Sequence, residues 1–171
     1  PELPLLMIQV ERQVIVALHI GPEDLSDHLF VGGAIEHGAL LAVLDALDLA
    51  GIPYAVASNG PPDKMQITLG QHGLIPRFRG HLYSGQAMGR PKPAPDLYLH
   101  AARALGVEPA LCAVVEDSAA GARAARLAGM RCYGYAPKGA HAGLLAEGAV
   151  LQLQKSWGKW CRWQEDTHGF A

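Results

Sequence analysis

Three segments of this chain combine residue types that phosphate chemistry needs, and they are Ser58-Asn59-Gly60, Lys92 and Glu116-Asp117. An enzyme acting on a phosphate ester needs hydrogen-bond donors for the phosphate oxygens, a cation and a nucleophile. The three segments offer a hydroxyl, an ammonium group and two carboxylates. Their spacing therefore raises the question of whether the fold brings them together.

The first segment follows a short apolar run, which makes it a candidate loop after a buried strand. The Ser58 hydroxyl can donate a hydrogen bond, and the turn at Asn59-Gly60 can add backbone N–H groups as a small anion-binding nest. The same composition is also typical of an ordinary turn without a ligand. Both interpretations remain open for this segment taken alone.

Lys92 lies in a segment with prolines at positions 91, 93 and 95. These prolines favour an extended, stiff backbone, so that the ammonium group is presented from a pre-set loop. A compact positive charge suits a phosphate and can also neutralise an adjacent carboxylate nucleophile. The alternative is an ordinary surface lysine in a proline-rich connection.

Glu116 and Asp117 come directly after the apolar run 111–115. Two acids at the end of a buried strand are costly unless they are paired or bind a metal. Mg²⁺ takes one or two carboxylates, waters and phosphate oxygens, so the pair fits a magnesium–phosphate site. Alternatively, Asp117 or Ser118 caps the following helix, and a capping role does not exclude a ligand role.

The elements around these segments alternate between helix and strand. Helical spacing or composition predicts helices over 39–49, 62–72, 95–105 and 119–127. Apolar runs predict strands over 13–20, 54–57, 82–84, 111–115 and 131–135. Such alternation predicts an α/β domain of three layers with a mainly parallel sheet. Ligands of such sheets bind beyond the carboxyl ends of the strands, where Ser58 and Glu116-Asp117 are expected.

Composition sets the class of protein. The chain has 171 residues, which fits one domain over 1–171, and a formal net charge of −2 without the basic excess of a nucleic-acid binder. No apolar run is long enough to cross a membrane and no signal peptide is recognisable, so a cytoplasmic protein is expected. Cys112, Cys132 and Cys161 are widely spaced, which argues against disulfides and a zinc site, and the apolar surroundings of Cys112 and Cys132 predict buried thiols. A first residue of Pro1 rather than Met fits a processed or incomplete product.

In order and spacing, the segments 90–98 (RPKPAPDLY) and 114–121 (VVEDSAAG) resemble the haloacid dehalogenase superfamily, in its phosphatase and beta-phosphoglucomutase-like branch. The resemblance covers about residues 38–148, and the ends 1–37 and 149–171 are irregular. It implies a magnesium-dependent phosphatase or phosphomutase acting on a small phosphorylated metabolite such as a sugar phosphate. It also implies a Rossmann-like domain and roles for single residues. Ser58 binds the phosphoryl group, Asn59 helps to place it, and Lys92 balances the charge of the nucleophile and the phosphoryl group. Asp117 holds Mg²⁺, with Glu116 assisting directly or through water.

One part of the family pattern is missing. The family's nucleophile is the first Asp of an Asp-x-Asp-Gly motif after the first strand, and this sequence contains no such motif. The strand predicted over 13–20 places Ala17 and His19 where the two aspartates belong, and neither can form an aspartyl-phosphate. Two explanations remain open: a chain that lacks its N-terminal portion and helical cap, or a degenerate, catalytically silent relative that binds phosphate, metal or a protein partner.

Overall fold

The structure is a computed structural model that describes residues 13–16, 37–78, 80–135, 142–149 and 151–153. Ala17 and His19, considered above as substitutes for the missing aspartates, lie outside these ranges. Residues 154–171, which include Trp157, Trp160 and Trp163, also lie outside them. All statements below concern the described residues.

Within these ranges, six strands form one parallel sheet in the order β3-β2-β1-β4-β5-β6. The strands are β1 (Gln13–Val16), β2 (Tyr54–Ser58), β3 (Leu82–Ser84), β4 (Cys112–Glu116), β5 (Arg131–Tyr135) and β6 (Leu151–Leu153). Because every pair is parallel, the carboxyl ends of all the strands meet at one edge. This confirms the predicted parallel α/β fold.

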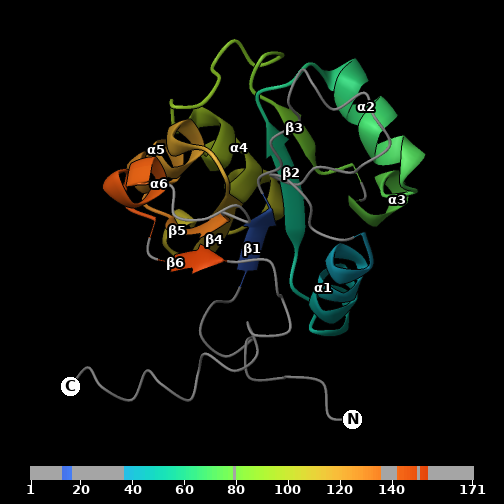
Figure 1. The fold of residues 1–171 in the computed structure, drawn as a ribbon. Coiled ribbons are helices and arrows are strands. Elements are labelled where there is room, and N and C mark those ends of the chain that lie inside the picture. The colour runs from blue at the N-terminus through green and yellow to red at the C-terminus, as the bar shows by residue number, and fades with distance from the viewer. Residues whose placement is uncertain (1–12, 17–36, 79, 136–141, 150, 154–171) are drawn as a thin grey trace, which may run out of the picture.

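Helices cover both faces of the sheet, which gives the three layers seen in Figure 1. One face carries α1 (His37–Leu49), α2 (Pro62–Gln71) and α3 (Ile75–Phe78), and the other carries α4 (Asp96–Leu105), α5 (Ala119–Leu127) and α6 (Ala142–Ala146). Each face has its own buried apolar cluster. The three-layer architecture expected from the sequence is therefore present.

The alternation of side chains along the strands decides which residues face which layer. In β2, Tyr54 and Val56 belong to the cluster under α1–α3, whereas Ala55 and Ala57 belong to the cluster under α4–α6. In β4, residues 112 and 114 belong to the α4–α6 cluster and residue 115 to the other. The same alternation directs Glu116, at the end of β4, toward α4 and α5.

The two helices nearest the site begin and end with recognisable signals. Helix α4 begins after Pro95, which lies at its N-cap, and ends at Gly106 in the left-handed region with φ 73°. Helix α5 has Ser118 as its N-cap, whose hydroxyl oxygen accepts a hydrogen bond from the N–H of Gly121 at 3.0 Å. Its buried face is made of Gly121 and alanines, which lets the helix lie close to the sheet.

Some short elements carry too little pattern for sequence-based prediction. These are α3, α6, β6 and a 3₁₀ turn, η2 (Pro109–Leu111). The predicted strand 111–115 is shifted by one residue, because Leu111 belongs to η2 and the strand runs on to Glu116. Cys112 and Cys132 are buried thiols, as expected. Among the described residues, no helix is long and apolar enough to span a membrane.

Candidate functional site

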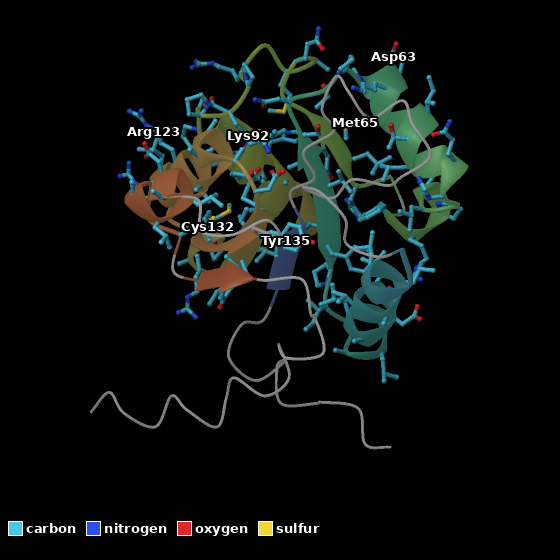
Figure 2. All side chains as sticks on the ribbon, viewed as in Figure 1. Asp63, Met65, Lys92, Arg123, Cys132 and Tyr135 are labelled. Atoms are coloured by element: carbon cyan, nitrogen blue, oxygen red, sulfur yellow. The ribbon has the colours of Figure 1, made fainter. Side chains whose placement is uncertain are left out.

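Three of the predicted site residues lie together, buried, at the carboxyl-end edge of the sheet. Ser58 ends β2, Glu116 ends β4, and Lys92 reaches in from the connection between β3 and α4. Their exposed fractions are 1%, 1% and 5%. Figure 2 shows Lys92 inside the molecule, whereas Arg123 and Asp63 lie on its outside. Lys92 is therefore not a surface lysine of a proline-rich connection.

Lys92 and Glu116 form a buried ion pair in which the Lys92 Nζ donates to Glu116 Oε1. The ammonium also donates to the backbone oxygen of Ala57 at 3.4 Å, and it lies 5.6 Å from the centre of the Tyr98 ring. Each charge would be costly at this depth without the other. The pair thus places a compensated cation beside the last residues of β2.

The Glu116 carboxylate accepts hydrogen bonds on both oxygens. The Tyr98 hydroxyl donates to Oε1 at 2.7 Å, while the N–H and the hydroxyl of Ser118 donate to Oε2 at 3.1 and 2.8 Å. Burial raises the pKa of Glu116, but the positive charge of Lys92 and these hydrogen bonds outweigh it and hold the pKa below its ordinary value. Glu116 is accordingly an ionised group with four donors, which satisfies the usual capacity of a carboxylate.

Gly121 leaves the space that this carboxylate occupies. A Cβ atom at position 121 would overlap the carboxyl carbon and both oxygens of Glu116. Gly121 lies in the first turn of α5, where the helix dipole also favours a negative charge. Helix α5 can therefore begin directly against Glu116 only because residue 121 has no side chain.

The side chain of Asn59 holds the backbone of Lys92. Its Nδ2 donates to the Lys92 oxygen at 3.0 Å, and its Oδ1 accepts from the Lys92 N–H at 2.7 Å. Gly85 allows this approach, since a Cβ there would lie 2.7 Å from Asn59 Oδ1 and 2.9 Å from the Cα of Pro91. Asn59 thus positions Lys92, in addition to any contact that its own backbone makes with a phosphate.

The turn after Ser58 is fixed by two serine hydroxyls. The Ser58 Oγ accepts a hydrogen bond from the N–H of Gly60 at 3.0 Å, and the Ser84 hydroxyl donates to the Gly60 oxygen at 2.6 Å. The Gly60 N–H is therefore already used, which differs from its expected place in an anion-binding nest. A hydroxyl that accepts one bond retains its proton for donation, so Ser58 can still donate to a phosphate oxygen.

Asp117 is the first residue after β4 and is half-buried, with its Oδ1 enclosed. Burial raises the pKa of Tyr135, and the negative charge of Asp117 adds to that effect. Among the described residues, no group of three or more His, Cys, Asp or Glu side chains could hold a metal. A single carboxylate with an acidic neighbour still fits Mg²⁺, which commonly binds through one or two carboxylates, waters and phosphate oxygens.

Sequence reasoning missed two contributors to this site, Tyr98 and Gly121. In the sequence, Tyr98 is one member of the apolar stripe of α4, and Gly121 is part of a helix rich in alanine. A signal was present in each case. A buried tyrosine needs a partner for its hydroxyl, and a glycine inside a helix is unfavourable unless space demands it. Neither signal names Glu116 as the partner, because that contact joins separate elements.

A sequence model of the haloacid dehalogenase-like hydrolases matches residues 23–129. The 6-phosphogluconate phosphatase of Escherichia coli (strain K12) is 41% identical over 96 residues, which are 56% of this chain and 41% of that enzyme. The validoxylamine A 7'-phosphate phosphatase of Streptomyces hygroscopicus subsp. limoneus is 33% identical over 119 residues, 70% of this chain and 53% of that protein.

Among solved structures, a HAD family hydrolase from Deinococcus radiodurans R1, crystallised with bound phosphate and sodium, is similar with a TM-score of 0.62 and 37% identity. The match covers 68% of this chain and 53% of that one. The chain thus spans about half the length, or less, of these relatives. The family match covers more than half of the chain and includes every residue of the site above. This protein belongs to the haloacid dehalogenase-like hydrolase family.

Proposed function

We propose that this chain carries the phosphate- and metal-binding part of a magnesium-dependent phosphatase or phosphomutase that acts on a small phosphorylated metabolite, such as a sugar phosphate. The observation that carries the proposal is the buried Lys92 ammonium, which donates to the backbone oxygen of Ala57, the residue before Ser58, at the carboxyl-end edge of a parallel sheet. Two relatives named above are phosphatases of small phosphorylated compounds. We further propose that residues 1–171 form a single domain, within which the family resemblance covers about residues 38–148.

The proposed division of labour follows the contacts. The Ser58 hydroxyl donates to a phosphoryl oxygen, and Lys92 balances the negative charge of that group from inside the protein. Glu116 orients the ammonium and offsets its charge, so that the cation can be buried before phosphate arrives. Asn59 fixes the backbone that carries Lys92. Such preorganised groups need no rearrangement when a phosphate binds.

Asp117 is the proposed main ligand of Mg²⁺. When bound, Mg²⁺ would neutralise phosphate charge and orient the phosphate oxygens. Glu116 would assist through a water molecule, or directly after exchanging one of its four hydrogen-bond donors. Both carboxylates follow the last apolar residue of β4, where a phosphate bound at Ser58 and Lys92 would be close.

The sequence favours a second candidate, a relative that binds phosphate or metal without turnover and could serve as an interaction protein. No Asp-x-Asp pair occurs in it. Strand β1 lies between β2 and β4, with Val16 in register with Val56 and Val115, and residues 17–20 (ALHI) contain no carboxylate. A covalent aspartyl-phosphate would therefore need a carboxylate from elsewhere in the chain or from residues beyond it.

A steady-state assay with p-nitrophenyl phosphate and Mg²⁺ separates the two candidates. The enzyme hypothesis expects turnover that Lys92→Ala and Asp117→Asn abolish and that Arg123→Ala, a change on the exposed side of α5, leaves intact. Calorimetric titration of the same chains with phosphate and with Mg²⁺ is the companion measurement. Binding without turnover would rule out catalysis by these 171 residues alone, and turnover by a chain extended with an upstream Asp-x-Asp-Gly motif would then separate a partial enzyme from a silent relative. A chain that binds neither phosphate nor Mg²⁺ would contradict both.

A further inference from the structure

Tyr98 is an aromatic side chain that contacts both members of the buried ion pair. It lies in α4 with an exposed fraction of 0%. Its hydroxyl donates to Glu116 Oε1 at 2.7 Å, the same oxygen to which the Lys92 Nζ donates, and its ring lies 5.6 Å from that nitrogen. A buried tyrosine that only filled space would not need this placement of its hydroxyl.

The two oxygens of Glu116 are held by different kinds of donor. Oε2 is fixed by the N–H and hydroxyl of Ser118, whereas Oε1 receives the Tyr98 hydroxyl and the Lys92 ammonium. An ammonium group on a flexible stem sets no preferred direction, whereas a phenol on a packed ring does. Without the phenol, Lys92 would be the only donor to Oε1. The carboxylate and the ammonium could then shift together, and the ammonium would lose its fixed position.

The surroundings keep the phenol a donor. Burial, and then the negative charge of Glu116, raise the pKa of Tyr98 well above its ordinary value. The hydroxyl therefore stays protonated throughout the neutral range. Of the three N–H bonds of the Lys92 ammonium, one points to Glu116 Oε1 and one to the backbone oxygen of Ala57, so one is left for another acceptor.

We infer that Tyr98 is a positioning residue of the phosphate site, whose hydroxyl holds the Glu116 carboxylate so that the Lys92 ammonium keeps a fixed place beside the end of β2. The consequence for phosphate affinity rests on the proposed function. The hydrogen bond itself and its effect on Lys92 do not.

The test compares the 171-residue chain with Tyr98→Phe, which keeps the ring and removes only the hydroxyl. Tyr54→Phe is the matched control, since it removes another buried tyrosine hydroxyl, bonded to Asp48 at 3.2 Å at the opposite end of β2. Inorganic phosphate is titrated in the presence of Mg²⁺ by calorimetry. In parallel, ¹⁵N NMR follows the ammonium signal of Lys92 and its rate of exchange with solvent.

Tyr98→Phe should weaken phosphate binding about tenfold, the lower end of what losing such an outer partner costs at metal sites. The Lys92 ammonium should exchange faster in this variant, and Tyr54→Phe should change neither quantity. A merely structural role would lower stability in both variants without a specific change at Lys92. Unchanged phosphate affinity with an unchanged Lys92 signal in Tyr98→Phe would overturn the inference and leave the proposed function standing.

If the parent chain binds no phosphate, the proposed function fails and the Lys92 signal alone decides on Tyr98. Faster exchange in Tyr98→Phe then supports the inference, and an unchanged rate overturns it. If Tyr98→Phe does not fold, the parent chain still decides. In the parent chain, the Tyr98 hydroxyl proton should exchange slowly with solvent and show a cross-peak to the Lys92 ammonium. Absence of this cross-peak, while the α4 amide protons are protected from exchange, would overturn the inference.

Discussion

At the scale of single residues, the site depends on an ion pair whose two charges are buried together. The side chains of Lys92 and Glu116 are 2% and 0% exposed, and every oxygen of the carboxylate has donors. Such a pair contributes little net stability compared with apolar residues of the same volume, but each member alone is expensive. The sequence pointed to both residues separately, through the proline-rich segment and the acidic pair. It could not show that they meet, because Lys92 lies on the connection between β3 and α4 and Glu116 at the end of β4.

A double-mutant cycle measures this interdependence. Lys92→Met should destabilise the protein by about 3–5 kcal/mol, because it leaves Glu116 charged and buried without its cation. Glu116→Gln should also destabilise it, and the double variant should lose much less than the sum of the two. Urea unfolding of the four chains gives the coupling free energy. Additive losses would contradict a direct interaction between the two side chains.

Gly121 gives a second prediction at this scale, with a matched control in the same chain. Gly121→Ala should destabilise the fold by about 1–3 kcal/mol and weaken phosphate binding, because the new methyl group overlaps the Glu116 carboxylate. Gly70→Ala, in α2, meets no atom within 4 Å and should stabilise the protein by about 0.5–1 kcal/mol. Urea unfolding measures both changes. If Gly121→Ala is as favourable as Gly70→Ala, the Glu116 carboxylate does not lie against α5 in solution.

At the scale of elements, the sequence predicted the long helices and central strands well, since their apolar spacing is regular. The predicted helix 119–127 matches α5, and the predicted strand 131–135 matches β5. Prediction was poorer for α3, which has four residues including Pro76. Such a segment forms because Phe78 packs into the core, an interaction that local sequence does not encode. The contacts between connections, such as that of Asn59 with Lys92, were beyond prediction for the same reason.

Asn59 joins two connections, and its removal should act on that junction. Asn59→Ala should cost about 1–3 kcal/mol, because two part-buried backbone groups of Lys92 lose their partners. Asn59→Asp keeps the acceptor for the Lys92 N–H but places a negative oxygen against the Lys92 carbonyl. Hydrogen exchange should therefore show faster exchange of the Lys92 amide in Asn59→Ala than in Asn59→Asp. Equal exchange in the parent and in Asn59→Ala would mean that the prolines alone hold this connection.

At the scale of the whole molecule, the sheet order brings the ends of β2 and β4 to either side of β1. This arrangement explains why Lys92 meets Glu116 near the end of β2, although 34 positions separate it from residue 58 and 24 from residue 116 along the chain. Parallel strands joined by helices must share one carboxyl-end edge, so the location of the site followed from the predicted fold class. The same topology gives each face of the sheet its own apolar cluster, and the cysteines in the α4–α6 cluster report on its integrity.

These thiols lead to a prediction of how stability depends on pH. Burial raises the pKa of Cys112 to about 11, and burial together with the charge of Glu116 raises that of Cys132 to about 12. The pKa of a cysteine thiol in an unfolded chain is ~8.5. Between these values the folded chain binds more protons than the unfolded chain, so the free energy of unfolding should fall as pH rises, by up to about 1.4 kcal/mol per pH unit for each thiol.

Urea unfolding under reducing conditions at pH 8 and pH 10 tests this in a Cys161→Ser background, so that only the two described thiols differ. Replacing both Cys112 and Cys132 by Ala should lower stability at pH 8 through lost packing, yet it should make the decline between pH 8 and pH 10 shallower. The difference between the two slopes isolates the thiols, because tyrosines and lysines titrate in both chains. Equal slopes would show that these thiols reach solvent in the folded state and that the α4–α6 cluster is open at pH 10.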